Sequence, residues 1–318
     1  MRKPMFIATL VALSLAAAGN VAAQSVTSAS LSAPLLEAVE QFKSAGKDPQ
    51  SKMFLSWGEF ITGEGETFVP VVLYVPKGSS LVDAGQNVTF FGVIQDAAGT
   101  TLTAFESTEP VIASKEDLYV EETLTVPGGE HRGYFGLARD GEVLGIVSSG
   151  LKLSGSLDRE ATAISPLILS NNLFPLDKPQ EPTDPFAFGG VKVVPKADRT
   201  FRKADELWYF FEMRNPGLAE PPLPADGTVP LAAVAASPRV QIKLDLEGKD
   251  TAGKTVKMTA PPREADVMEM RGVPGHYGVG SAIPLESFRA GEYTLTVKVI
   301  DTVKKASQTM TETFRVVE

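Results

Sequence analysis

The chain ends in two alternating runs, Gly291-Glu-Tyr-Thr-Leu-Thr-Val-Lys-Val-Ile-Asp301 and, after a polar turn, Ser307-Gln-Thr-Met-Thr-Glu-Thr-Phe-Arg-Val316. Large apolar residues alternate with polar ones in both runs, and they are Tyr293, Leu295, Val297, Val299, Met310, Phe314 and Val316. Between Met310 and Val316, Glu312 is the one polar residue on the apolar parity. A period of two over consecutive segments predicts an antiparallel hairpin with one buried and one exposed face. A lone hairpin is marginally stable in water, so this one requires a sheet behind it.

Short runs of the same kind fill residues 51–164, and turn residues separate them. We expect strands at Met53–Phe60, Thr67–Val75, Gln86–Gln95, Leu102–Ser107, Tyr119–Val126, Arg132–Ala138 and Val143–Leu153. Segments such as Asp96-Ala-Ala-Gly99 and Arg139-Asp-Gly-Glu142 supply the residues that tight turns favour. Short strands at this spacing predict an all-β sandwich.

A proline-rich stretch divides the chain. Prolines follow one another at 175, 179, 182 and 185, and proline both removes ladder hydrogen bonds and stiffens a segment. We therefore place a connector at residues 165–190, in which Ser165–Ser170 could form an edge strand. The strands expected beyond it are Val191–Val194, Glu206–Met213, Arg239–Leu246, Thr255–Thr259, Asp266–Met270, Gly275–Ser281 and the closing hairpin. Glu206–Met213 is apolar at both parities, which predicts a central strand. The expected fold is two tandem immunoglobulin-like antiparallel β-sandwiches, at 51–164 and 191–318.

The first 23 residues have the pattern of a secretory signal peptide. Arg2 and Lys3 precede an apolar run from Met5 to Ala18, and Val21-Ala-Ala23 fits the cleavage pattern. We expect cleavage after Ala23 and a periplasmic or secreted protein; the alternative is an uncleaved N-terminal anchor.

The N-terminal segment 24–50 contains one helical pattern. Its apolar residues at helical spacing are Leu35, Leu36, Val39 and Phe42. This spacing predicts a short amphipathic helix over residues 32–45 that docks on the first sandwich, with Ser30 or Ser32 as its N-cap.

Composition excludes several classes of protein. The chain has no cysteine, which excludes thiol catalysis, zinc held by cysteine and iron–sulfur centres. Removal of residues 1–23 takes away Arg2, Lys3 and no acid, so the formal net charge moves from -9 to -11. An acidic chain without a basic cluster is a poor partner for nucleic acid or an anionic membrane surface. No second long apolar run appears, so no membrane span is expected in the mature protein.

The second half carries a family resemblance. Its residues are Ser165–Leu176, Gly190-Val-Lys-Val-Val-Pro195, Arg199-Thr-Phe201, Glu206–Asn215 and the closing hairpin. They resemble the exported β-sandwich region of bacterial von Willebrand-related and GWxTD-domain proteins, over about residues 165–318. The resemblance implies fold and location and carries over no catalytic residue. A D-x-S-x-S motif is absent, and Trp57-Gly58 is followed by Glu-Phe-Ile instead of completing G-W-x-T-D.

Motifs for catalysis are missing. His131 and His276 are the two histidines, and they lie in Gly-rich turns of different halves without paired-ligand spacing, so we expect structural or solvent-facing roles. No G-x-S-x-G elbow or phosphate-binding G-x-x-x-x-G-K-[ST] loop is present, and Gly275-His-Tyr-Gly-Val-Gly280 lies between strands. We therefore assign no catalytic residue, no cofactor and no metal ligand.

Acidic residues come close together at three places. The pairs are Glu64 with Glu66, Glu121 with Glu122, and Glu264 with Asp266. Glycoside cleavage needs two facing carboxyl groups, whereas neighbours on a strand point to opposite faces and acids beside turns are usually solvated. Loop oxygens from Asp96, Asp140, Glu142 and Asp226 leave a weak calcium site open, although no EF-hand pattern is present.

The remaining hypotheses concern binding. The Pro- and Ala-rich segment 215–238 is long for a loop in a compact domain, and such loops are usually functional or disordered. We expect it to be an interaction loop with candidate residues Asn215, Leu218, Pro222, Leu223, Asp226, Val229 and Leu231. Together with the connector and exposed strand edges, it favours a non-enzymatic interaction or scaffold module that binds an envelope or secreted protein. One alternative is a carbohydrate-binding module that uses an exposed Trp57 or Tyr134 for polysaccharide. A further alternative is an enzyme whose site the sequence spacing does not reveal.

Overall fold

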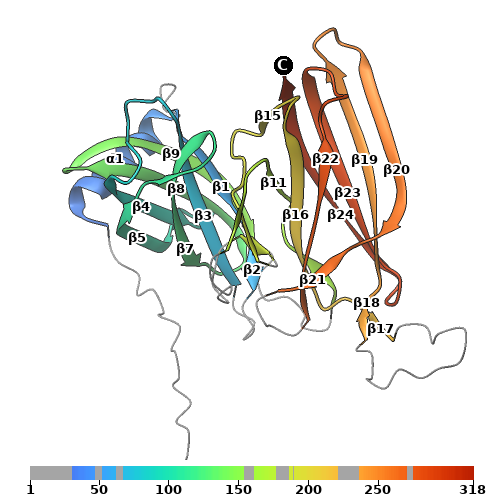
Figure 1. The fold of residues 1–318 in the computed structure, drawn as a ribbon. Helices are drawn as coiled ribbons and strands as arrows, with labels where there is room; N and C mark the ends of the chain where they lie inside the picture. Colours follow the sequence, from blue (N-terminus) through green and yellow to red (C-terminus); the bar gives the residue numbers. More distant parts are fainter. Residues whose placement is uncertain are drawn as a thin grey trace, which may run out of the picture.

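The computed structural model describes residues 31–46, 52–61, 67–153, 161–176, 186–188, 190–220, 236–270 and 275–318. Within these ranges most residues lie in β-strands, which form antiparallel sheets apart from one parallel pair, and there is one short helix (Figure 1). The all-β sandwich prediction is confirmed. The immunoglobulin-like type and the count of two domains stay predictions.

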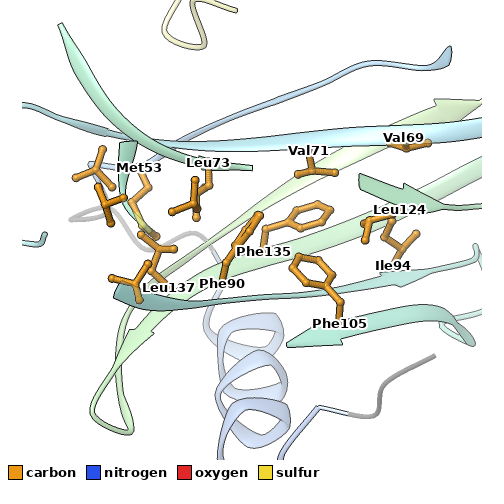
Figure 2. Packing of buried hydrophobic residues seen from close by; sticks show 14 of the residues in the cluster. Met53, Val69, Val71, Leu73, Phe90, Ile94, Phe105, Leu124, Phe135 and Leu137 are labelled. Atoms are coloured by element: carbon orange, nitrogen blue, oxygen red, sulfur yellow. The ribbon is translucent and has the colours of Figure 1, made fainter. Parts of the chain in front are cut away.

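Two sheets formed by residues 54–153 pack on each other and make the first sandwich. The strands are β1 (Phe54–Trp57), β2 (Phe60–Ile61), β3 (Thr67–Pro76), β4 (Asn87–Gln95), β5 (Thr101–Pro110), β6 (Ile112–Ala113), β7 (Asp117–Thr125), β8 (Gly129–Arg139) and β9 (Glu142–Leu153). One sheet has the order β1-β3-β7-β6, with β2 also on β3, and the other has the order β5-β4-β8-β9. Alternate residues of β3, Val69, Val71 and Leu73, meet Phe90, Phe105 and Phe135 of the facing sheet to form the core (Figure 2).

The expected N-terminal helix forms as α1 (Ala33–Ala45) and covers the outer face of the β5-β4-β8-β9 sheet. Leu35 and Val39 are buried against Phe91 and Val93 of β4. Ser32 is the N-cap residue, but its side chain makes no capping hydrogen bond; its backbone amide instead donates to a Glu106 carboxylate oxygen at 2.8 Å. The helix is therefore held by apolar packing and by this contact with β5.

Two further sheets make the second sandwich. Its strands are β10 (Ala163–Ile164), β11 (Ile168–Ser170), β15 (Thr200–Arg202), β16 (Glu206–Arg214), β19 (Val240–Asp250), β20 (Thr255–Glu264), β21 (Val267–Glu269), β22 (His276–Pro284), β23 (Gly291–Asp301) and β24 (Ala306–Val317). One sheet has the order β10-β16-β22-β21, with β11 also on β16, and the other has the order β15-β24-β23-β19-β20.

The closing hairpin behaves as its alternation predicts. In the β23–β24 ladder Tyr293 faces Phe314 and Val297 faces Met310, and the apolar parity of β23 is buried. Glu312 faces Leu295 on this side, and Arg199 lies 3.6 Å from its carboxylate. Burial raises the pKa of Glu312, and the Arg199 charge partly offsets that rise. The one polar residue on the apolar parity is thus matched by a cation from a distant segment.

The two sandwiches meet through a third apolar cluster. Val72 and Tyr74, on the second face of β3, pack with Phe210 of β16 and Ile168 of β11. Both β3 and β16 are therefore apolar at both parities because each has a core of its own sandwich on one face and the junction on the other. At its edge, Lys196 is almost fully buried, and its ammonium reaches the carboxylates of Glu116, Asp117 and Asp198 at 3.0, 3.5 and 3.1 Å.

Several strands are longer than expected, as β20 is (Thr255–Glu264 against Thr255–Thr259), and short strands such as β6, β10 and β15 were not expected; two further differences concern an interruption and the connector. The expected strand Met53–Phe60 is interrupted at Gly58 and Glu59, where β1 ends and β2 has not begun. The connector 165–190 also contains regular structure: β11 pairs with β16, and β12 (Leu173–Pro175), β13 (Ala187–Phe188) and β14 (Val191–Val193) form a small sheet of order β12-β14-β13. Pro175 lies in one of these short ladders, and Pro179, Pro182 and Pro185 fall within residues 177–185, outside the described ranges.

Candidate functional site

The second sandwich is open along one side. After β20 the chain crosses to the other sheet as β21, which pairs only with Tyr277, Gly278 and Val279 of β22. Among the described residues no strand pairs with Gly280–Pro284 on the side of β22 away from β16. The inner face of β20 therefore looks into a space that the facing sheet leaves uncovered.

This space is an apolar groove of about 200 Å³. It is lined by Leu244, Leu246, Met258, Thr259, Ala260, Ile283, Phe288 and Leu295. Met258 and Ala260 stand opposite Leu246 and Leu244 in the β19–β20 ladder, so all four share the inner face. Met258 is 48% exposed, which is unusual for a large apolar side chain on the core parity of a strand.

The two strand edges beside the groove differ in their capacity to accept another strand. β20 carries Pro261 and Pro262 beside its register irregularity, and the charged Arg263 follows them. Prolines and charges are common means of protecting an edge strand from pairing. Gly280–Ile283 of β22 have small or apolar side chains and contain no proline, so the backbone groups that point away from β16 can form a ladder; beside this edge the Arg263 guanidinium of β20 donates to the Ser281 hydroxyl at 2.7 Å.

The base of the predicted interaction loop is built on Asp301. Its buried carboxylate accepts hydrogen bonds from the amides of Gly217, Val303 and Lys304 at 2.7, 3.0 and 2.9 Å, and from the Thr162 hydroxyl at 3.1 Å. Burial raises the pKa of Asp301, but these hydrogen bonds outweigh it and hold the pKa below its ordinary value.

Two of the predicted loop residues lie on this base. Asn215 has a left-handed backbone (φ 48°), and its amide donates to the Gly275 carbonyl at 2.8 Å. Leu218 begins β17 (Leu218–Ala219), which pairs with β18 (Ser237–Pro238), and it is 48% exposed. The other predicted loop residues, Pro222, Leu223, Asp226, Val229 and Leu231, lie outside the described residues.

Both predicted aromatics are partly exposed and partly packed. Trp57 is half-buried and packs against the core of the first sandwich. Tyr134 is half-buried under α1, with its ring edge-on to Phe42 at 6.3 Å and the Lys43 ammonium 5.9 Å from its centroid. Both rings contribute to packing in the structure, Trp57 against the core of the first sandwich and Tyr134 against residues of α1.

The candidate acid–base residues are dispersed. His131 is half-buried on β8, and one of its ring nitrogens lies 2.7 Å from the Pro127 carbonyl oxygen. Glu121 and Glu122 face opposite sides of β7, as expected, and Glu121 binds Lys192 at 2.9 Å. Within the part of the chain that the structure describes, no group of three or more His, Asp or Glu side chains could hold a metal ion. In the same part, no helix is long and apolar enough to cross a membrane.

One buried charged cluster was not foreseen from the sequence. The imidazole Nδ1 of His276 lies 2.5 Å from a Glu212 carboxylate oxygen, and the guanidinium Nε of Arg214 lies 4.0 Å from the same oxygen. All three side chains are almost fully buried at the end of β16, and the buried Glu59 of the first sandwich acts on Arg214 across the junction. The sequence held one signal for this cluster. Glu212 and Arg214 are two positions apart at the end of a largely apolar strand, so they place two charges on the same face of it.

Comparisons with known proteins give little further guidance. No family model matches the chain, and no curated protein matches it. Among solved structures, the crystal structure of red sea bream transglutaminase has 12% sequence identity and a TM-score of 0.19; the match covers 89% of this chain and 34% of that one. A similarity of this size carries no argument about fold or function.

Proposed function

We propose that this chain is a non-catalytic, exported protein-interaction module whose second sandwich binds an extended segment of a partner protein. The observation that carries the proposal is the apolar groove beside the unpaired edge of β22. An extended peptide laid along Gly280–Pro284 would continue the sheet that β21 only begins. Backbone hydrogen bonds would supply affinity, and alternate side chains would enter the groove and supply specificity.

The groove matches such a ligand in size and chemistry. An apolar cavity of about 150 Å³ accepts a benzene ring, so a groove of about 200 Å³ accommodates one aromatic or branched aliphatic side chain. Full burial of such a side chain contributes about 1.5–3 kcal/mol. The partner segment should therefore carry apolar residues at alternate positions and polar residues between them.

The remaining parts of the proposal rest on the sequence. The signal-peptide pattern of residues 1–23 supports a periplasmic or secreted location, and an envelope or secreted protein is then the expected partner. The resemblance to exported von Willebrand-related and GWxTD-domain proteins agrees with this location and stays a prediction. The 215–238 loop stays a second candidate surface, since Leu218 is exposed at its base. A carbohydrate-binding role is less supported because Trp57 and Tyr134 are half-buried.

The test is a selection for peptides that bind the protein without residues 1–23. A displayed library of random peptides is screened against the wild type, against Ala260→Arg, which places a cation in the groove, and against Thr255→Arg on the exposed face of the same strand. We expect selected peptides to alternate apolar and polar residues. They should bind the wild type and Thr255→Arg equally, lose at least tenfold in affinity for Ala260→Arg, and slow amide exchange in Gly280–Ile283.

A fourth protein distinguishes the loop from the groove. In it a short Gly/Ser turn replaces residues 221–235. Binding lost in this protein and kept in Ala260→Arg would move the recognition surface to the loop. Selection of no peptide, or of peptides without alternation that leave amide exchange in β22 unchanged, would refute strand addition.

A further inference from the structure

The open edge of β22 has a definite end. β21 occupies this side of β22 as far as Val279, which pairs with Val267, the first residue of β21. The chain between β20 and β21 crosses from one sheet to the other at this point, and the Ala265 amide donates to the carbonyl of the first residue of β19 at 2.9 Å. A strand added along Gly280–Pro284 therefore meets β21 end to end and cannot continue past it.

The direction of such a strand follows from the sheet. β10, β11 and β22 are antiparallel to β16, and β21 is antiparallel to β22. Antiparallel pairing is also slightly more stable per residue than parallel pairing. The open part of β22 runs from Gly280 to Pro284, so an antiparallel ligand enters beside Pro284 and ends beside Gly280. The end that meets β21 is then the carboxyl terminus of the ligand.

Arg263 of β20 lies at this end of the groove. Ala260 and Arg263 are three positions apart, which would place them on opposite faces of a regular strand. The register irregularity at Pro261 and Pro262 changes this, because Ala260 stands opposite Leu244 and Arg263 stands opposite Ile242, and both partners belong to the inner face of β19. Arg263 is therefore on the groove side of β20.

The guanidinium of Arg263 has unused hydrogen-bonding capacity. It donates to the Ser281 hydroxyl at 2.7 Å, and Ser281 shares the inner face of β22 with the groove residue Ile283. Glu264 and Asp266 follow Arg263 in the chain, but no carboxylate among the described residues forms an ion pair with it. A guanidinium has several N–H donors in a planar fork that matches a carboxylate. Neighbouring strands lie about 4.8 Å apart, so a carboxylate at the end of a strand beside Ser281 is within its reach.

We propose that the groove recognises the carboxyl terminus of its partner protein: an apolar side chain near the terminus enters the groove, and the terminal carboxylate binds Arg263. The carboxylate site rests on the groove being the binding surface proposed above, and it adds which part of the partner is bound. The side chains that line the groove are uncharged. Arg263 is therefore the group that distinguishes a chain terminus from an internal segment with the same side chains.

The test compares two sets of short synthetic peptides of random sequence, all acetylated at the amino terminus. One set ends in a free carboxylate and the other in an amide. Each set is applied to the protein without residues 1–23, retained peptides are identified by mass spectrometry, and the affinities of matched free and amidated forms are measured. The same measurements are made on Arg263→Gln and on Lys257→Gln, which removes a cation from the outer face of the same strand, where Lys257 binds Glu247 at 2.6 Å.

We expect free peptides to bind the wild type about five- to tenfold more tightly than their amidated forms, because the carboxylate pair is planar and partly exposed. Arg263→Gln should abolish this preference, and Lys257→Gln should keep it. Equal binding of free and amidated peptides by the wild type would refute the carboxylate site, whether or not any variant folds; if these peptides still alternate and are lost in Ala260→Arg, the groove itself stands. A preference kept in Arg263→Gln, or retention of no peptide from either set, would also refute it.

Discussion

Replacement of Phe210 by alanine should uncouple the two sandwiches. Phe210 is 3% exposed and packs in the junction cluster, with its ring centroid 6.0 Å from that of Trp208. Phe211, the next residue of β16, is fully buried in the core of the second sandwich. Because adjacent strand residues point to opposite faces, the two alanine variants remove the same side chain from two different cores.

The two variants should differ in what they destabilise. Loss of a buried phenylalanine costs about 3–5 kcal/mol in total. For Phe210, the part that depends on contact with the first sandwich is the burial of its ring, about 1.5–3 kcal/mol, or about 10- to 150-fold in the closing equilibrium. For Phe211→Ala, nearly all of the loss falls on the second sandwich itself.

Scanning calorimetry separates these outcomes. We expect the wild type to unfold in one cooperative transition and Phe210→Ala to unfold in two, one for each sandwich. Phe211→Ala should lower the melting temperature of the second sandwich and leave closure less affected. If Phe210→Ala keeps one transition and shifts it no more than Phe211→Ala does, the junction is not the element that couples the sandwiches, and the reasoning fails.

Three further predictions concern single residues. Lys196→Met should lower the free energy of unfolding at pH 7 by about 3 kcal/mol, because three carboxylates lose their cation. Urea titration at pH 4, where these acids begin to be protonated, should show a smaller loss. Asp301→Ala should lower the free energy of unfolding at pH 7 by about 3 kcal/mol. Since the pKa of Asp301 is lowered in the folded state, the stability that its carboxylate contributes is present near neutrality and is lost on acidification below about pH 4. A variant whose deficit is the same at pH 3 and pH 7 would contradict that sign. Gly248→Ala should lower the free energy of unfolding by about 1–3 kcal/mol, because its Cβ would clash with the Glu292 carbonyl and the Tyr293 ring. Gly150→Ala is the matched control, since its Cβ meets no atom within 4 Å, and it should be neutral or slightly stabilising in thermal melts.

Much of the strand pattern could be predicted because it is local. The alternation of Tyr293, Leu295 and Val297 specifies a strand with one buried face whatever it packs against, and β23 follows it. The interruption at Gly58 and Glu59 was not predictable in the same way. Glu59 lies between β1 and β2 and is buried at the junction. There its charge interacts with that of the buried Arg214, which is more than 150 positions later in the chain.

The candidate site could be predicted only in outline. Exposed strand edges were expected as a binding surface, but the sequence of β20 does not tell whether Met258 faces a core or open space. That depends on β21, which covers three residues of β22 and then ends. Tyr134 is the opposite case. The sequence suggested an exposed ring, but the ring lies on a strand face that α1 covers.

By itself, the sequence determined the all-β class, the positions of the long strands and of the short helix, and the exclusion of thiol chemistry. These properties follow from periodicity, turn residues and composition, which act over a few neighbouring positions. Only the tertiary structure decided why β3 and β16 are apolar on both faces, which cation matches Glu312, where the groove opens, and how Glu59, Glu212, Arg214 and His276 meet at the junction. Each of these depends on contacts between segments far apart in the chain, and one face of a strand acquires its partner only when the sheets pack.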